Sequence, residues 1–416
     1  MFVLVAMTVL ATTATFASAS GADAKNARRG RDGIAKIDHV VVLMQENRSY
    51  DHYFGLLHHE GQPHSANEPR RGNPNPLAPH EKIRPFVQPN MCEVADLAHG
   101  WDATHREIDG GRMDGFTAQN VDPKDPTGSR TMGRYDSGAL PFYYALANQF
   151  AVADRYFASV PGPTFPNRFY LLAGSSFGHI SNDLPPKGGF PQPTIFGSLE
   201  AAHVSWKIYL ASAQVELLFS DVLQHSDHVF PVSQYYTDAA HGTLPQVSFV
   251  ESQPFGPSEN DEHPPANPQL GQRFTHDLLQ ALAGGPDWTS SAFFLLYDEH
   301  GGYYDHVKPP AAVPPDDIRP NGHPGQAFDS YGVRVPALVI SPWAKAHSVS
   351  HTVYDHTSVL KFIETRFGLA PLTRRDAAAD PMLQMFDFSH MSVPHPNLPA
   401  APIDPAGVAQ CASVNG

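Results

Sequence analysis

Two acidic pairs stand where apolar stretches of this chain end. The stretch IDHVVVLMQEN is apolar until it reaches Glu46 and Asn47. A second stretch, SAFFLLYDE, is apolar until Asp298 and Glu299. Both stretches are predicted to be buried strands. Because ligands of an open parallel sheet bind beyond the carboxyl ends of its strands, these oxygen ligands favour a divalent-cation site there, although Asn47 is also explained as a helix N-cap.

A hydroxyl group stands at a third turn. Thr164 lies in GPTFPNR, two residues before Pro166, which suits the first turn of a helix because the N–H that proline lacks is unpaired there in any case. A helix start carries positive partial charge and free N–H groups, which hold a phosphate and stabilise an alkoxide. Thr164 is therefore a nucleophile candidate; the alternative is an ordinary N-cap threonine. Asn167 could donate to a phosphoryl oxygen, and Arg168 would either clamp a phosphate or pair with an acid.

Several of the 23 histidines are candidates for a proton donor. A leaving oxygen must be protonated when an ester is cleaved, and histidine is the usual donor near neutral pH. Taken singly, each is better explained as a hydrogen-bonded loop residue. The candidates are His99, His105, His263, His306 and His356. A His/Cys zinc site is not indicated, because the two cysteines lie far apart and no H-x-x-x-H pair falls on a plausible helix.

Strands that alternate with helices must position these groups. Further strands are predicted at 204–210, 246–251 and 333–341, and helices at 142–157, 169–173, 273–283 and 356–367. Segments 61–90 and 254–268 are rich in proline and polar residues and predict irregular loops, and the chain after residue 380 is expected to wrap the surface. The alternation favours an α/β fold with a mostly parallel sheet.

The charge balance narrows the range of partners. The formal net charge is −14 over 416 residues, so the protein would repel nucleic acid and anionic membrane surfaces at long range. Recognition of a phosphate group must then be local, through a metal ion and helix N-termini. No interior stretch approaches the roughly 20 apolar residues that a membrane-spanning helix needs. Oligomeric state is not indicated by any pattern in the chain.

The N-terminus and the cysteines predict export. Residues 1–19 are uncharged, apolar and end on Ala17-Ser18-Ala19, which is typical of a signal peptide, with a disordered tail as the alternative. Residues 20–33 are expected to be a linker. In a secreted or periplasmic protein, Cys92 and Cys411 would form one disulfide, although two buried thiols are also open.

Five sequence blocks carry a resemblance to a known family. The blocks are ENRSYDHYFG, GPTFPNRFY, SENDEHPP, YDEHGGYYDHV and GVRVPALVISPWA, and they occur in family order between residues 37 and 367. The chain thereby resembles the bacterial and plant phosphoesterase family, which includes the non-specific phospholipases C and related acid phosphatases. The resemblance implies an alkaline-phosphatase-like α/β core, a mostly parallel sheet flanked by helices, with Pro-rich loop excursions.

The resemblance also implies a site. It implies one divalent metal ion of unspecified identity, a nucleophile at Thr164, a phosphate contact at Asn167 and active-site histidines at His99 and His263. The positions that it implies for the metal ligands are Glu46, Asn47, Thr164, Asp298 and Glu299.

These observations predict a secreted, metal-dependent phosphoesterase. Its catalytic domain would span 34–395, with a tail at 396–416, and it would hydrolyse phosphodiesters such as phospholipids through a phospho-threonine intermediate. An acid phosphatase acting on monoesters is the alternative, and a non-enzymatic secreted scaffold a remote one. A sulfatase is disfavoured, because threonine in the T-x-P-x-R pattern cannot be converted to formylglycine.

Overall fold

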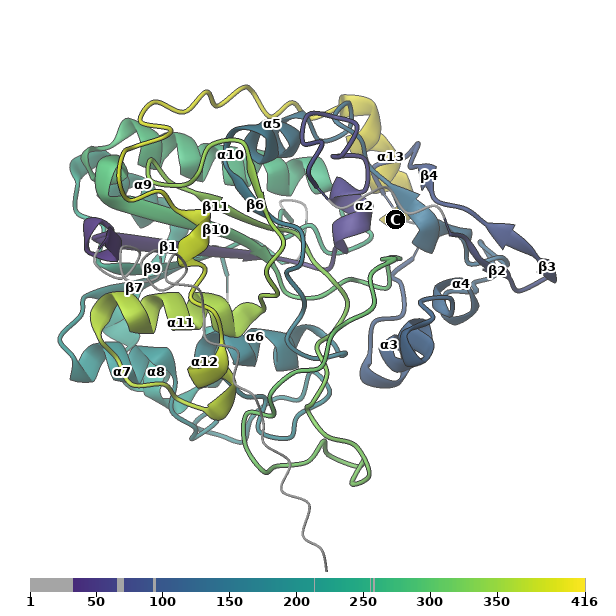
Figure 1. Cartoon of the computed structure of the whole chain (residues 1–416), viewed down its shortest axis with the longest axis horizontal. Coiled ribbons are helices and arrows are strands. Elements are labelled where there is room, and N and C mark those ends of the chain that lie inside the picture. The colour runs from purple at the N-terminus through teal and green to yellow at the C-terminus, as the bar shows by residue number, and fades with distance from the viewer. Residues whose placement is uncertain are drawn as a thin grey trace, which may run out of the picture.

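The chain is built around one eight-stranded sheet (Figure 1). The computed structural model describes residues 33–65, 71–92, 95–212, 214–254, 256 and 259–415. In sheet order the strands are β12 (Ser348–Ser350), β6 (Ala151–Ala153), β11 (Ala337–Ile340), β10 (Ser291–Tyr297), β1 (His39–Gln45), β9 (Val247–Glu251), β7 (Trp206–Leu210) and β8 (Val229–Pro231). All neighbours pair in parallel except β11, which is antiparallel to both β10 and β6. The predicted α/β fold with a mostly parallel sheet flanked by helices is confirmed.

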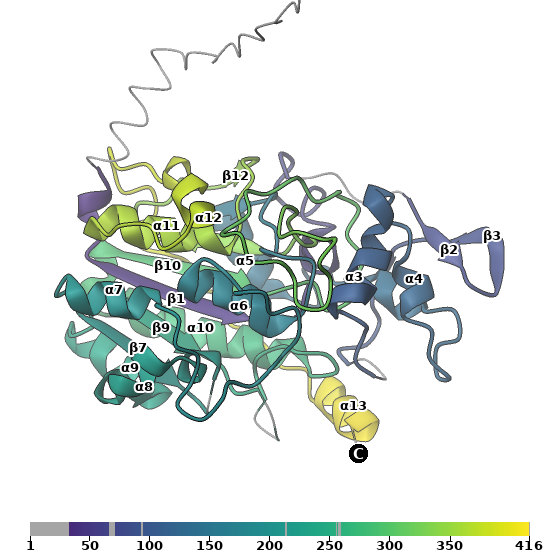
Figure 2. The same ribbon diagram turned by 90° about the horizontal axis from the view of Figure 1, so that it is seen from below.

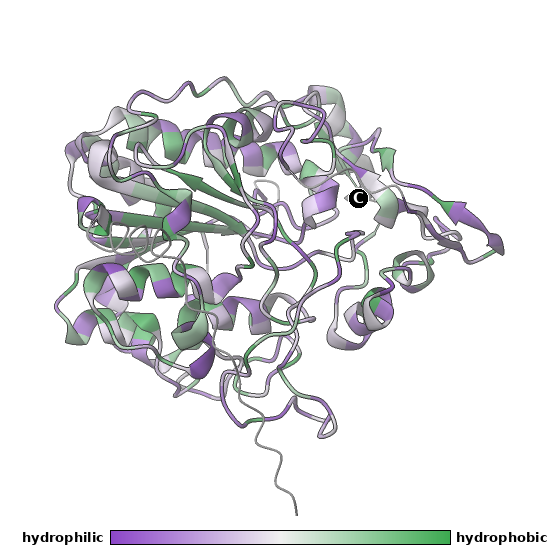
Figure 3. Ribbon diagram, in the orientation of Figure 1, coloured by the Kyte–Doolittle hydropathy of each residue, from purple (hydrophilic) through white to green (hydrophobic). Residues whose placement is uncertain are grey.

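The central strands are apolar because both faces of the sheet are covered. Every residue of β10 is buried, and in β1 only His39 is partly exposed. A parallel sheet with helices on both sides requires continuous apolar strands, which explains the two runs seen in the sequence. Figure 3 shows the apolar colour concentrated in these strands. The predicted strands at 204–210 and 246–251 are present as β7 and β9, and 333–341 contains the shorter β11.

Helices cover the sheet on both faces (Figures 1 and 2). One face carries α5 (Pro141–Gln149), α9 (Val232–His241) and α10 (Pro268–Gly284). The other carries α6 (Thr164–Ala173), α7 (Ile195–Ala201), α8 (Ser220–Gln224), α11 (His356–Phe367) and α12 (Arg374–Ala378). The predicted helix at 356–367 is confirmed. The one predicted at 273–283 begins earlier, at Pro268, where Asn267 accepts a hydrogen bond from the backbone of Gln269 and caps the helix.

The helix predicted at 142–157 is wrong in its second half. Helix α5 ends at Gln149, Phe150 adopts an extended conformation, and Ala151–Ala153 form the buried strand β6 between β11 and β12. Apolar residues in a short buried strand cannot be told from those of a buried helix by spacing alone. Pairing with two neighbouring strands therefore decided the conformation of this segment.

An excursion lies beyond the carboxyl edge of the sheet (Figures 1 and 2). Its elements are α2 (Tyr50–Phe54), β2 (Asn73–Asn75), β3 (Ala78–Ile83), β4 (Phe86–Val87), α3 (Trp101–Ile108), α4 (Phe116–Gln119) and β5 (Gly133–Arg134). Segment 61–90 is thus less irregular than predicted, because β2 pairs with β3 and β4 pairs with β5.

The C-terminal segment returns to this excursion. Helix α13 (Pro405–Asn415) ends the described chain, and Cys92 and Cys411 form a disulfide with their Cα atoms 5.3 Å apart. The predicted signal peptide and most of the linker lie outside the described residues, and the division into a catalytic domain and a tail stays a prediction. Among the described helices, none is long and apolar enough to cross a membrane.

Candidate active site

The two polar pairs meet at the carboxyl edge of the sheet. Glu46 and Asn47 follow β1, and Asp298 and Glu299 follow β10. The strands are parallel neighbours, so their ends lie at the same level. The backbone N–H of Asn47 donates to Asp298 Oδ1 at 3.2 Å. The structure therefore brings the two predicted pairs together.

Arg168 lies among these carboxylates. Its Nη1 is 2.7 Å from Glu251 Oε2, its Nη2 is 3.0 Å from Glu46 Oε1, and its Nε is 3.7 Å from Asp298 Oδ2. Burial works to lower the pKa of Arg168, but these carboxylates outweigh it and raise the pKa. Of the two roles that the sequence left open, Arg168 takes the pairing with acids. It anchors helix α6 to the ends of three strands.

Glu251 is a member of this cluster that sequence reasoning missed. It is the last residue of β9 and is buried. Burial and the neighbouring Glu216 raise its pKa well above the usual range, against the opposing effect of Arg168. The signal was available, because Glu251 ends an apolar strand in the same way as Glu46 and Asp298 follow theirs.

Buried oxygen atoms without partners fit a cation. Among the described residues, no hydrogen bond reaches either polar side-chain atom of Asn47, Asp298 Oδ2 or Glu299 Oε1. Such atoms are costly to bury unless something binds them. Burial and the nearby Glu46 also raise the pKa of Asp298 well above its usual range, a repulsion that a bound cation relieves. All of these donors are hard oxygen atoms, so Asn47, Asp298 and Glu299 fit a divalent metal ion. Glu46 can add the carboxylate oxygen that does not bond Arg168.

Thr164 is the first residue of helix α6. The N-cap is Pro163, in an extended conformation, so the described structure does not show the ordinary N-cap threonine that was the alternative. Thr164 is 5% exposed. Residues four apart lie on one side of a helix, so Thr164 is on the side of α6 that carries Arg168. Thr164 also lies at the positive end of the helix dipole.

Asn167 holds the turn before Thr164. Its Oδ1 accepts from the N–H of Val160 at 3.0 Å, and its Nδ2 donates to the carbonyls of Gly162 at 2.8 Å and Pro163 at 3.1 Å. Asn167 is fully buried. In this structure its amide is engaged with the backbone and fixes the turn that presents Thr164; the predicted phosphate contact stays a prediction.

His99 and His263 lie together, and His99 is close to Glu299. Their ring centroids are 5.8 Å apart, and His99 Nε2 is 4.0 Å from Glu299 Oε1. His99 Nδ1 bonds the carbonyl of Leu97 at 2.7 Å and His263 Nδ1 that of Pro264 at 2.6 Å, which assigns the Nδ1–H tautomer to both and leaves each Nε2 free of these contacts. Burial lowers the pKa of His99, but Glu299 and then Asp96 raise it above its usual value.

His300 is a second group that the sequence did not single out. It is buried, with Nε2 2.8 Å from Glu107 Oε2 and Nδ1 3.1 Å from Glu299 Oε2. Burial opposes its charge, but the bonds to Glu107 and Glu299 prevail and raise its pKa to about 9. His300 therefore holds one oxygen of Glu299 and leaves the other free. Its place directly after the predicted pair was the available signal.

The other three histidine candidates lie elsewhere. His105 Nδ1 bonds the carbonyl of Trp101 at 2.7 Å, within helix α3. His356 is buried between the Tyr156 hydroxyl and the Asp298 carbonyl, and burial lowers its pKa to about 3. His306 Nδ1 lies 2.7 Å from Asp51 Oδ2. Among the described contacts, none joins His105 or His306 to the strand-end cluster, and His356 reaches it only through the backbone carbonyl of Asp298.

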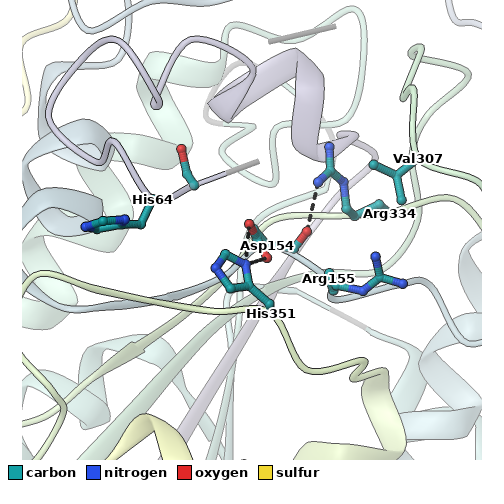
Figure 4. Close-up of a pocket in the computed structure, with 7 residues that line it drawn as sticks. His64, Asp154, Arg155, Val307, Arg334 and His351 are labelled. Atoms are coloured by element: carbon teal, nitrogen blue, oxygen red, sulfur yellow. Dashed lines mark hydrogen bonds and ion pairs between the residues drawn. The ribbon is translucent and has the colours of Figure 1, made fainter. Parts of the chain in front are cut away.

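A cavity of about 360 Å³ lies at the same sheet edge, beyond β6 and β12 (Figure 4). Its lining contains none of the predicted site residues and consists of His64, Ser65, Asp154, Arg155, Val307, Arg334 and His351. Arg334 is buried and bonds Asp51, Asp305 and the carbonyl of Asp154. As Figure 4 shows, the carboxylate of Asp154 faces His351, whose Nδ1 lies 2.9 Å from Oδ1.

Comparison with known proteins identifies the family of this chain. The model of the Phosphoesterase family matches residues 37–370. The chain is 32% identical over 391 residues to "Non-specific phospholipase C6" of Arabidopsis thaliana, covering 86% of this chain and 74% of the relative. It is 32% identical over 464 residues to "Non-hemolytic phospholipase C" of Burkholderia pseudomallei, and the match covers 90% of this chain but only 62% of that relative.

A distant likeness to a solved structure adds no detail. The phosphonate monoester hydrolase of Agrobacterium radiobacter aligns over 80% of this chain and 74% of its own, at 10% identity and a TM-score of 0.34. A likeness that distant says nothing about the chemistry of this chain. Family and relatives together define the class as hydrolases acting on phosphate esters. The chain belongs to the Phosphoesterase family, as its sequence blocks predicted.

Proposed function

We propose that this protein is a metal-dependent phosphodiesterase of the phospholipase C type, which cleaves phospholipids at the phosphate. One observation carries the proposal: the strand-end cluster that Arg168 ties to helix α6 contains buried oxygen atoms without hydrogen-bond partners, and Thr164 is the first residue of that helix. The names of the relatives support a phospholipid as the substrate. Binding of a single divalent ion by Glu46, Asn47, Thr164, Asp298 and Glu299 is part of the proposal.

Thr164 is the proposed nucleophile. Its oxygen attacks phosphorus, the bond to the leaving alcohol breaks, and a phospho-threonine forms; water then releases the phosphorylated head group. Arg168 keeps α6 fixed against the strand ends, and Asn167 keeps the preceding turn in place, so the hydroxyl is oriented before substrate arrives. When bound, a divalent ion supplies Lewis acidity, which favours the threonine alkoxide and offsets charge on the phosphoryl group.

His99 and His263 handle the proton. Each has an Nε2 that its Nδ1–carbonyl bond does not use; His99 lies beside Glu299, and His263 lies beside His99. One of them protonates the departing alcohol oxygen, and the same group can then accept a proton from water when the phospho-threonine is hydrolysed. The raised pKa of His99 keeps it protonated nearer to neutral pH.

Export is part of the proposal. The disulfide between Cys92 and Cys411 fits an oxidising compartment, so the protein is proposed to act outside the cytoplasm, secreted or in the periplasm. Reducing-agent sensitivity of the melting temperature, together with cell fractionation, tests this point. Full recovery of the protein in the cytosol with both thiols free would contradict it.

The test of the function is a pair of chromogenic substrates. Hydrolysis of p-nitrophenylphosphorylcholine and p-nitrophenyl phosphate is measured with and without chelator. We expect the choline diester to be preferred and the activity to fall on chelation. Preference for the monoester would make the protein an acid phosphatase, and activity on neither would overturn the proposal. Mass spectrometry of acid-quenched enzyme should find phosphate or the head group on the peptide containing Thr164, and a modification elsewhere would exclude Thr164 as the nucleophile.

A further inference from the structure

Glu262 is a buried carboxylate that the mechanism above does not use. It is fully buried and accepts hydrogen bonds from the hydroxyls of Tyr53, Tyr143 and Tyr297, the last at 2.8 Å. Gln45 Nε2 donates to its Oε1 at 3.2 Å. These donors come from α2, α5, β10 and β1, so one side chain ties together four elements of the fold.

The backbone around Glu262 is held as firmly as its side chain. Arg48 Nε donates to the Glu262 carbonyl at 3.0 Å. The carbonyls of Asn260 and Asp261 accept from Gln45 Nε2 at 3.1 Å and from the N–H of Glu46 at 2.8 Å. Glu262 has a φ of +74°, in the left-handed region that is costly for a residue with a side chain. A strained conformation of this kind persists only where the surroundings impose it.

The next residue is His263, one of the two proposed proton donors. Its described hydrogen bonds are local: its N–H donates to Asp261 Oδ1 at 3.0 Å, and its Nδ1 bonds the Pro264 carbonyl. The position of the His263 ring relative to His99 therefore depends on the backbone conformation at Glu262. A small displacement of a catalytic group costs much of the rate, because proton transfer requires hydrogen-bond distance.

We propose that Glu262 is a positioning residue, which fixes the backbone so that His263 faces the leaving oxygen; this rests on the proposed function. This positioning role differs from a role in folding alone, because it predicts that a single step of the reaction becomes slower. The affected step is protonation of the leaving group. Attack by Thr164 depends on helix α6, which no described bond of Glu262 reaches; at the strand ends Glu262 bonds the side chains of Gln45 and Tyr297 and not the proposed metal ligands.

Helix α10 offers a matched pair of variants. A Cβ on Gly271 would lie 2.2 Å from Glu262 Cγ, so Gly271→Ala must displace the Glu262 side chain. A Cβ on Gly284, at the end of the same helix, would meet nothing within 4 Å. Gly284→Ala is therefore the control. Glu262→Gln, which keeps the shape but replaces one of the oxygens that accept from the three phenols by an NH2 group, is the second test should Gly271→Ala fail to fold.

The decisive readout is the dependence on the leaving group. p-Nitrophenolate departs without a proton, whereas the alcohol of a short-chain phosphatidylcholine needs one. We expect Glu262→Gln and Gly271→Ala to lower kcat for the phosphatidylcholine by about tenfold or more and for p-nitrophenylphosphorylcholine by less than about threefold, with KM unchanged and Gly284→Ala like the unmodified protein. If the protein prefers monoesters, glycerol phosphate replaces the phosphatidylcholine and p-nitrophenyl phosphate replaces the choline diester, because glycerol also needs a proton to leave and p-nitrophenolate does not. Equal loss on both leaving groups would show a merely structural role and overturn the proposal.

Histidine NMR keeps this test separate from that of the function. The ring signal of His263, assigned with His263→Ala, should shift or broaden in Glu262→Gln and stay unchanged in Gly284→Ala. An unchanged His263 signal in Glu262→Gln overturns the positioning role, whether or not the protein hydrolyses any phosphate ester. A shifted signal in a protein that cleaves none of the four substrates supports the positioning role and refutes the proposed function instead.

Discussion

Two buried arginines at the same sheet edge hold carboxylates in different ways. Arg334 bonds Asp305 at 3.1 Å and Asp51 at 2.8 Å, and none of the three side chains has a buried polar atom without a partner in the described structure. Around Arg168, by contrast, Asp298 Oδ2 and Arg168 Nε lack hydrogen-bond partners among the described residues. Folding alone favours the first arrangement. The unmatched atoms at Arg168 are what distinguishes a candidate site from a structural ion network.

The strongest way to test this contrast is to remove the nucleophile. Thr164→Ala should lower kcat by about three orders of magnitude or more, because no second hydroxyl replaces the attacking group, while the melting temperature stays within a few degrees. Thr164→Ser keeps a hydroxyl at the helix start and is expected to retain measurable turnover. Near-normal activity of purified Thr164→Ala would show that Thr164 is not the nucleophile.

Paired carboxylate variants compare the two clusters directly. Asp298→Asn should lower both the bound metal, measured by elemental analysis, and kcat by about tenfold to a hundredfold, because a charged oxygen of the proposed ligand set is lost. Asp305→Asn is the matched control beside Arg334, and there the metal content should not change. Equal metal content in the two variants would show that the two clusters do not differ in metal binding and that Asp298 is not a metal ligand.

Arg334 should matter for stability and not for metal. Arg334→Met leaves the carboxylates of Asp51 and Asp305 buried without their cation, and we expect a loss of about 3–5 kcal/mol of unfolding free energy. Urea unfolding with and without chelator measures it. The loss should be the same in both conditions, and a loss that appears only in the presence of metal would place Arg334 in the same functional unit as Arg168.

The sequence predicted the strand ends of this site better than its surroundings. Glu46 and Asp298 could be placed because long apolar strands in a parallel sheet must end at a common edge. The role of Arg168 could not be decided, since it depends on which way helix α6 packs. The strand β6 was missed because three apolar residues become a strand only through pairing with β11 and β12. The tyrosine contacts of Glu262 join residues up to 209 positions apart, a distance over which no local pattern carries information.

The smallest expected effect concerns His300, which connects the site to the excursion through Glu107. Its pKa is raised to about 9, against burial, by its bonds to Glu107 and Glu299. A group with a raised folded-state pKa stabilises the fold fully below its unfolded pKa of about 6.5, and that stabilisation is lost as the pH rises through the folded value. The unfolding free energy should therefore fall by on the order of 1–3 kcal/mol between about pH 6.5 and 9.5.

His300→Gln isolates this contribution from other titrations. The variant should unfold more easily than the unmodified protein at pH 6, and the difference should shrink toward pH 9.5, where His300 is neutral in both states. Urea unfolding at the two pH values in the presence of chelator measures the effect of the His300 bonds to Glu107 and Glu299 without a bound metal. A difference that is constant with pH would mean that His300 is neutral in the folded protein. The carboxylate of Glu299 would then be held less firmly by His300, and the contrast between this site and the Arg334 cluster would be weaker.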